Sequence, residues 1–177
     1  MEILSLGEKI RNRRKELKMT LKDLAGDRVT AGQLSFVELG KSNPSTELLE
    51  YIAQRLNVSV DYLLESEVSQ AKSICESNIR IAQAYIYDKG DEDAEKLLNE
   101  TYQMALHYDL GDLMGRIELN RGKIALHNEK YEEAMVHFLK ADEYFITYRD
   151  IPEEIEAYIM LAETSNKLGS YNIAISY

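Results

Sequence analysis

The stretch Thr20–Ser45, TLKDLAGDRVTAGQLSFVELGKSNPS, decides the fold of the N-terminal part of the chain. It predicts two short helices that are separated by a tight turn and followed by a polar loop. Thr20 and Thr30 are both good helix N-caps, and Gly26 breaks the first helix between them. Apolar residues recur at helical spacing behind each cap. Two helices packed in this way leave the outer face of the second free to enter a DNA major groove.

Helical periodicity continues on both sides of this stretch. Residues 6–18 predict an amphipathic helix, and a further helix is capped by Ser45 or Thr46. Ser59 caps a last short helix, VDYLLE. Five helices in so short a segment predict a compact domain that is small but able to fold alone. We therefore expect residues 1–65 to form a DNA-binding domain.

Charge is distributed unevenly along the chain, whose net charge is −10. Residues 1–65 contain ten basic and ten acidic residues, whereas residues 66–177 contain eleven basic and twenty-one acidic ones. Seven cations crowd into fourteen positions of the first part: Lys9, Arg11, Arg13, Arg14, Lys15, Lys18 and Lys22. This asymmetry favours a basic DNA-facing module joined to an acidic module, although a charged helix face is more often simply solvated.

Composition favours a soluble protein of the cytoplasm. The only cysteine, Cys75, has no partner for an internal disulfide, which suits a reducing compartment. The start, MEILSLGEKIR, lacks the layout of a signal peptide, and no apolar run approaches the length of a bilayer span. With 45% apolar residues, the 177-residue chain can build one large or two small packed cores.

Three segments resemble the lambda-repressor-like (Cro/C1, or XRE) helix-turn-helix domain in order and spacing: LGEKIRNRRKELKMTLKDLA, QLSFVELGKSNPS and LLEYIAQRLNVSVDYLL. The resemblance covers residues 4–65 and implies a five-helix DNA-binding domain with Thr30–Leu39 as its recognition helix. Between Ala25 and Val29 the turn is one residue shorter than the common pattern. This short form resembles the PlcR/Rgg-like (RNPP) regulators, in which a second domain of helical repeats binds a peptide signal.

The resemblance also implies which residues meet DNA. Gln33 can form paired hydrogen bonds with the major-groove edge of adenine, and Ala31 can touch a thymine methyl group. The loop that contains Lys41 matches the one that holds phosphates, with Arg13 as a possible addition. The implied DNA-binding set is Lys22, Thr30, Ala31, Gln33, Ser35, Phe36, Lys41, Ser42 and Asn43.

Other positions of this domain carry structural implications. Arg14 lies on the apolar stripe of its helix and needs a partner if it is buried. By the resemblance that partner is Glu38, in a buried ion pair. Leu21 stands where relatives often place a DNA-contacting glutamine, and Gly32 weakens the recognition helix by about 1 kcal/mol.

From Ser66 onward the sequence repeats at a spacing of 40 residues. Small residues mark the repeat at Ala82, Gly122 and Ala162. Another small residue follows twelve positions after each of these, at Ala94, Ala134 and Ala174. The segment GKIALHNEKYEEAMVHFLKA follows the tetratricopeptide (TPR) pattern, in which small residues let paired helices approach closely. We therefore expect an all-α protein with a TPR-like helical solenoid over residues 66–177. HEAT-like repeats fit the small residues less well, and a plain helical dimerisation domain is the simpler alternative.

The TPR pattern places polar residues on the inner face of the solenoid, where an extended peptide could bind. Asparagine and glutamine amides can donate to and accept from a peptide backbone together, and Arg116 and Lys123 could hold a carboxylate. The predicted peptide-binding set is Gln83, Tyr87, Arg116, Asn120, Lys123, His127 and Asn166. Each of these residues could equally be an ordinary solvent-facing polar residue.

Nothing in the sequence favours an enzyme, a cofactor or a metal site. GDLMG at 111–115 lacks the lysine and strand context of a phosphate-binding loop. His107, His127 and His137 have no i,i+4 pairing of the kind that binds a metal. The final segment, YNIAISY, would begin the second helix of a third repeat, so we expect the chain to be a fragment of a longer protein.

Together these observations predict a cytoplasmic transcriptional regulator of the quorum-sensing type. It would bind double-stranded operator DNA as a homodimer, and a signal in the repeats, expected to be a short peptide, would control it. The alternative is a TPR-type adaptor, or a regulator that responds to a partner protein instead of a peptide.

Overall fold

The computed structural model describes residues 2–169, and the regular structure in that range is entirely α-helical. The chain forms two compact units, Met1–Gln70 and Ala71–Tyr177. Their boundary lies five residues after the predicted one, because the first turn of the following helix belongs to the N-terminal unit. There the Gln70 side-chain amide donates to the carbonyl of Leu4 (2.9 Å) and accepts from its N–H (3.1 Å).

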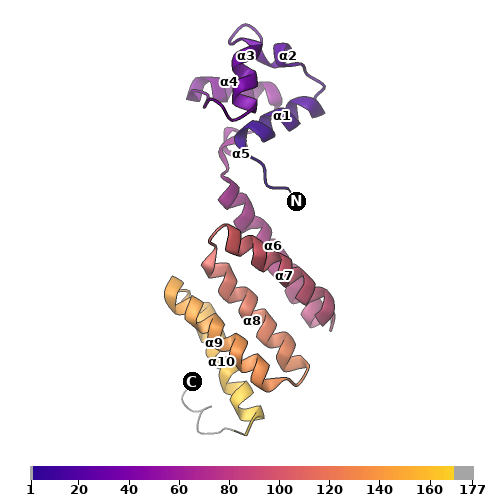
Figure 1. Ribbon diagram of the computed structural model, residues 1–177, viewed down its shortest axis with the longest axis vertical. Helices are drawn as coiled ribbons and strands as arrows, with labels where there is room; N and C mark the ends of the chain where they lie inside the picture. The colour runs from indigo at the N-terminus through magenta and orange to yellow at the C-terminus, as the bar shows by residue number, and fades with distance from the viewer. Residues whose placement is uncertain (1, 170–177) are drawn as a thin grey trace. The chain divides into compact units, whose positions relative to one another are not determined.

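The N-terminal unit contains five short helices (Figure 1). Their bounds are α1 Leu6–Glu16, α2 Leu21–Ala25, α3 Ala31–Glu38, α4 Thr46–Leu56 and α5 Val60–Leu64. Each begins behind a serine or threonine whose side chain accepts a hydrogen bond from a backbone N–H of the first turn: Ser5, Thr20, Thr30, Ser45 and Ser59. Because these caps satisfy N–H groups that the helix cannot, they determine where each helix starts.

One apolar core holds the five helices together. Its buried members come from every helix: Ile10, Leu24, Ala25, Leu34, Val37, Leu49, Ile52, Ala53, Leu56 and Leu63. The turn between α2 and α3 depends on Gly26, which has a φ of +52° that L side chains rarely adopt. A Cβ atom at this position would also collide with the Tyr51 hydroxyl. The turn that the sequence predicts at Gly26 therefore has both a local and a packing reason.

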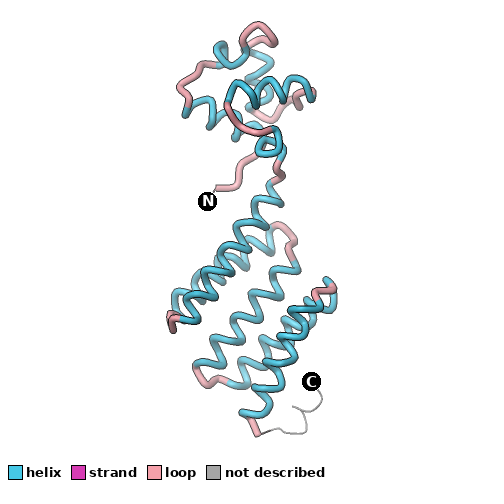
Figure 2. The backbone as a smooth tube through the Cα atoms, turned by 180° about the vertical axis from the view of Figure 1, so that it is seen from behind, coloured by secondary structure: helices cyan, strands magenta, loops and turns pink. Residues whose placement is uncertain are grey.

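The second unit is a stack of antiparallel helices, which Figure 2 shows as successive long rods. They are α6 Glu67–Tyr87, α7 Asp91–His107, α8 Gly111–His127, α9 Tyr131–Tyr148 and α10 Ile151–Lys167. The last four start at positions 91, 111, 131 and 151, so one helix pair repeats every 40 residues. This confirms the period that the sequence predicts and the helical solenoid that it implies.

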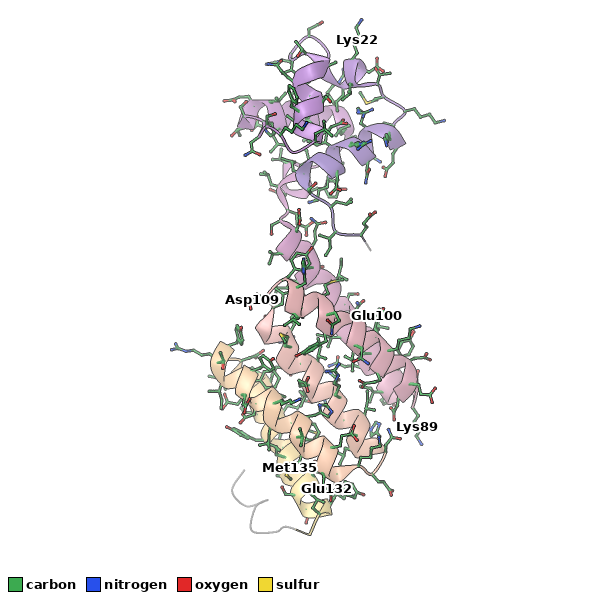
Figure 3. All side chains as sticks on the ribbon, viewed as in Figure 1. Lys22, Lys89, Glu100, Asp109, Glu132 and Met135 are labelled. Atoms are coloured by element: carbon green, nitrogen blue, oxygen red, sulfur yellow. The ribbon has the colours of Figure 1, made fainter. Side chains whose placement is uncertain are left out.

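A left-handed residue ends each turn of the second unit, again at a spacing of 20 residues. These residues, with φ between +54° and +71°, are Lys89, Asp109, Glu129, Arg149 and Gly169. In the first four turns the next residue donates its N–H to a carbonyl five positions earlier, as Gly90 does to Tyr85 (2.8 Å), which closes the preceding helix in a Schellman motif. Figure 3 labels Lys89 and Asp109 in two of these turns. Four of these five left-handed residues are not glycine.

Small residues bring the paired helices together as the repeat pattern predicts. A Cβ atom added to Gly122 on α8 would fall onto the ring of Phe138 on α9, and Gly115 meets Phe145 in the same way. Ala82 and Ala134 are fully buried. The predicted second helix of a third repeat, including Ala174, lies outside the described residues.

Among the residues that the structure describes, none of the helices has the length and hydropathy that crossing a membrane requires. Within the same range, no group of three or more histidine, cysteine, aspartate or glutamate side chains is placed to hold a metal ion.

Candidate functional sites

The predicted DNA-binding residues lie on α2, at the N-cap of α3, on α3 itself and on the loop that follows it. Seven of the nine are exposed: Lys22, Thr30, Gln33, Phe36, Lys41, Ser42 and Asn43. Ala31 and Ser35 are half-buried at the edge of the same helix. The opposite face of α3 is in the core, since Leu34 and Val37 are at most 4% exposed. α3 therefore turns one side inward and leaves the other open along its length.

A buried ion pair holds α3 against α1. The Arg14 guanidinium donates two hydrogen bonds to the Glu38 carboxylate, at 2.6 and 2.8 Å, and a third to the carbonyl of Met19 at 2.9 Å. Both side chains are largely buried, with 12% and 5% of their surfaces exposed. The hydrogen bond to Glu38 raises the pKa of Arg14 above its ordinary value. The pair implied by the family resemblance is thus present, and it orients the candidate recognition helix.

Two residues of the basic cluster, Lys9 and Arg13, bond to backbone carbonyls inside the domain. Lys9 is only 1% exposed, and its ammonium donates to the carbonyls of Tyr62 (2.8 Å) and Glu65 (2.7 Å) at the end of α5. Burial lowers its pKa. Arg13 donates to the carbonyl of Leu56 (3.1 Å), which argues against a phosphate contact. These two cations stabilise the fold, because they satisfy backbone carbonyls that helices leave open.

The cations that remain open near α3 come from its flanks. Lys22 on α2 extends away from the domain in Figure 3, and Lys41 follows the end of α3. Arg28, in the turn before α3, is also exposed, and its guanidinium lies 5.9 Å from the centre of the Tyr51 ring. Arg28 is not among the DNA-binding residues that the sequence predicts. A basic residue just before the recognition helix is the signal that could have identified it.

Gln33 has a structural role that the sequence analysis did not assign to it. It is the third residue of α3, and its Oε1 accepts from the Thr30 N–H (3.0 Å) and from the Thr30 hydroxyl (3.2 Å). The Thr30 hydroxyl in turn accepts from the Gln33 N–H at 3.1 Å. This reciprocal capping box engages the amide oxygen of Gln33. A paired contact with adenine needs that oxygen and the amide nitrogen together, so it would require the capping box to open.

The predicted peptide-binding residues do not all lie at one place in the second unit. Lys123 and His127 line one cavity, whereas Gln83, Tyr87 and Asn166 are exposed and lie outside it. Arg116 pairs with Asp150, the N-cap of α10, at 3.2 Å and with Glu153 on α10 at 3.3 Å, and Lys123 pairs with Glu156 at 2.6 Å. These bridges connect α8 with α10.

Asn120 is buried in α8 and not displayed on an open face, since it is 1% exposed. Its Nδ2 donates to the carbonyl of Arg116 at 2.7 Å. Its Oδ1 is also buried, and it accepts from no group that the structure describes.

The cavity has a volume of about 410 Å³ and is lined mainly from the first helix of each pair. Its lining residues are Ile86, Lys123, Leu126, His127, Glu129, Tyr131, Met160, Glu163 and Lys167. Apolar side chains and charges of both signs therefore meet in one hollow whose size suits a ligand of a few residues. Of these residues, only Lys123 and His127 were in the predicted set; helical spacing from Lys123 and Glu163 could have pointed to Leu126 and Lys167.

Glu118 is the most deeply buried acid of the second unit, at 3% exposed. Its carboxylate lies 2.7 Å from His137 Nδ1 and accepts from Arg121 at 2.9 Å. Burial raises its pKa, but the hydrogen bond to His137 and the charge of Arg121 outweigh this, so that the net pKa is lowered. The contact of His137 with Glu118 therefore joins α9 to α8, and it accounts for the presence of His137.

Residues 10–63 match the family model described as helix-turn-helix. The N-terminal unit is therefore a helix-turn-helix domain of the DNA-binding XRE type. The matched segment contains α2 and α3, both partners of the Arg14–Glu38 pair and all nine predicted DNA-binding residues.

Three solved structures resemble the chain over most of its length. One is PlcR of Bacillus thuringiensis in complex with the peptide PapR7 and DNA, with 16% identity over 93% of this chain and 88% of that one and a TM-score of 0.38. A second is ComR from S. thermophilus in complex with DNA and its signalling peptide ComS, with 15% identity over 91% and 100% and a TM-score of 0.43.

The third is the apo form of the competence regulator ComR from Streptococcus vestibularis, with 18% identity over 97% of this chain and 75% of that one and a TM-score of 0.34. A search of curated proteins finds no match.

Proposed function

We propose that the protein is a dimeric transcriptional regulator, which binds operator DNA through its helix-turn-helix domain and a short peptide through its repeats. The observation that carries the proposal is the match of residues 10–63 to the helix-turn-helix family, combined with the open face of α3. In such domains the second helix of the motif enters the major groove, and phosphate contacts from its surroundings set its orientation. Lys22, Arg28 and Lys41 are exposed cations that suit those phosphate contacts.

Binding of DNA should depend steeply on salt, and Lys41 should contribute to that dependence. Each neutralised phosphate adds about 0.9 to the slope of log affinity against log salt concentration. We expect Lys41→Ala to weaken binding to all duplexes alike and to reduce the slope by about one. The measurement is fluorescence anisotropy of the full chain with duplexes from its own promoter and with random duplexes, from 50 to about 300 mM salt.

Lys130→Ala is the matched control, because Lys130 is an exposed lysine of the second unit. It pairs with Glu133, three positions further along the chain, at 3.3 Å. This variant should leave both the affinity and the slope unchanged. If no duplex binds better than random DNA, or if both lysine variants reduce the slope equally, the DNA-binding proposal is wrong.

The peptide part of the proposal is supported by the cavity between α6, α8 and α10. Lys123 and Lys167 can meet a carboxylate there, Glu163 can meet an ammonium group, and Leu126 and Met160 offer apolar contact. A peptide carries both kinds of charged group at its ends, together with apolar side chains. This combination of groups in one cavity is what favours a peptide over a purely apolar ligand.

A peptide that occupies the cavity should raise the melting temperature of the full chain. At one hundred times the dissociation constant, binding stabilises the folded state by about 2.7 kcal/mol. We expect synthetic peptides from short reading frames beside the gene to include one that produces this shift in a thermal unfolding assay. Lys123→Ala should reduce the shift strongly and Lys22→Ala, in the other unit, should not. A shift that survives Lys123→Ala would mean that the peptide binds elsewhere.

The alternative function, an adaptor for a partner protein, is favoured by one feature of α10. Ile151, Ile155 and Ile159 form an exposed apolar row at helical spacing, with 55–63% of each residue exposed. Such a row suits contact with another protein. The salt experiment separates the two functions, because an adaptor needs no preference for any duplex.

A further inference from the structure

The open face of α3 carries no charge. The one charged residue of the helix, Glu38, is 8% exposed and paired with Arg14. The side that faces solvent carries Gly32, Gln33 and Phe36, and Phe36 is 52% exposed. Phenylalanine is an unusual residue to leave open in the middle of a short helix, since burying it is worth about 1.5–3 kcal/mol. A large ring on the face that would meet DNA therefore calls for a contact in the complex.

The two neighbours of Phe36 on this face offer little discrimination between bases. The Oε1 atom of Gln33 is engaged by Thr30, at 3.0 and 3.2 Å, so only the amide nitrogen is left to meet DNA. A single donor is accepted by guanine, by thymine and by N7 of adenine alike. Gly32 has no side chain, and the nearest atom to a Cβ placed on it is the Thr30 hydroxyl at 3.8 Å. The backbone can therefore approach a base edge closely at this point.

Gly32 and Phe36 are four positions apart, so they lie one above the other on the same side of α3. Because Gly32 has no side chain, there is room beside the exposed Phe36 ring for a small apolar group. In the major groove only thymine presents such a group, its 5-methyl. Guanine is read mostly by arginine or lysine, and the open face of α3 carries neither.

We propose that Phe36 reads thymine through its 5-methyl group, so that the domain selects its sites by apolar contact with A·T pairs. This inference rests on the proposed DNA-binding function and adds the base that the recognition helix distinguishes. The division of roles follows from the charge distribution. Lys22, Arg28 and Lys41 beside α3 hold phosphates without regard to sequence, and the neutral face between them supplies the selection.

The test removes only the 5-methyl group of thymine from the DNA. Duplexes that the full chain retains from a random pool are sequenced, and each thymine of the enriched site is then replaced singly by deoxyuridine. One buried methyl group corresponds to about a fourfold change in affinity. We expect a weakening of this size for the wild-type protein at one or two positions of each half-site. With Phe36→Ala, thymine and deoxyuridine should bind equally at those positions.

Gln33→Ala serves as the matched variant, because it changes a neighbouring exposed residue and should keep the preference for thymine over deoxyuridine. Melting temperatures will show whether each variant is folded. Phe36→Ala is expected to fold, because Phe36 is exposed. If a site is enriched but deoxyuridine has no effect, or if Phe36→Ala keeps the preference, this inference is wrong and the proposed function stands. If Phe36→Ala instead turns a dimer into a monomer in sedimentation, Phe36 belongs to an interface between two copies. If no duplex is enriched, the proposed function itself fails.

Discussion

Glu38→Gln is expected to destabilise the helix-turn-helix domain by about 3 kcal/mol, because it leaves the buried Arg14 guanidinium without a counter-charge. The side-chain shape is nearly unchanged, so the effect isolates the charge. The Glu38 side chain is 5% exposed, and it accepts two of the three hydrogen bonds that Arg14 donates. Because the pair joins α1 to α3, the loss should appear first in the orientation of the candidate recognition helix. The measurement is amide hydrogen exchange of α1, α3 and α4 in the full chain, read by mass spectrometry.

Glu16→Gln is the control for this prediction. Glu16 makes the same kind of contact with Arg13, at 2.8 Å, but 62% of its side chain is exposed. Exposed pairs contribute at most about 1 kcal/mol, and a pair within one helix rather less. Equal losses for the two variants would show that the buried pair does not hold the domain together.

Cys75 provides an internal reference for both variants. Its thiol is fully buried in the second unit, and burial together with the charge of Glu76 raises its pKa to about 11. A thiol-specific reagent should therefore react with it only when that unit opens. The labelling rate should not change in either variant of the first unit.

Gly7→Ala should destabilise the same domain by about 2–3 kcal/mol, because a methyl group has no space between α1 and α3. The added Cβ atom would lie 2.5 Å from the carbonyl oxygen of Glu38 and 2.8 Å from that of Val37. Both atoms belong to the backbone, so no side-chain rotation can relieve the contact. The two helices must separate, and hydrogen exchange in α1 and α3 should report the cost.

The same substitution at Gly32 should have the opposite sign. Gly32 is the second residue of α3, and an added Cβ atom would meet nothing closer than the Thr30 hydroxyl at 3.8 Å. Alanine is favoured over glycine inside a helix by about 0.5–1 kcal/mol, so Gly32→Ala should stabilise the domain. If Gly7→Ala stabilises the domain as Gly32→Ala should, helix propensity and not the α1–α3 contact governs position 7.

The helix starts of the N-terminal unit could be predicted because their causes are local. A serine or threonine cap acts on N–H groups two or three residues ahead, so Thr20, Thr30 and Ser59 mark α2, α3 and α5 by themselves. The predicted end of α1 at residue 18 was two residues late, because Lys18 has a φ of +56° and the Met19 N–H bonds to the carbonyl of Arg14. Nothing in the sequence indicates that the backbone at Lys18 adopts a positive φ.

The candidate sites could be predicted only in part, because a residue type does not reveal what surrounds it. Lys9 and Arg13 belong to a dense basic run, yet both bond to carbonyls of helices that lie more than forty residues away in the chain. Asn120 falls at a groove position of the repeat pattern but is buried. In each case the partner comes from a distant segment, which no local pattern contains.

The class of fold, the helix-turn-helix motif and the 40-residue repeat could all be predicted from the sequence. All three depend on caps, apolar periodicity and small residues that act within one or two turns of a helix. The tertiary structure alone decided which cations stay open, that the capping box engages Gln33, and that the cavity brings Lys123 together with Glu163 and Lys167. The physical reason is the same for each: burial, ion pairing and cavity shape depend on atoms that the chain brings together only when its helices pack.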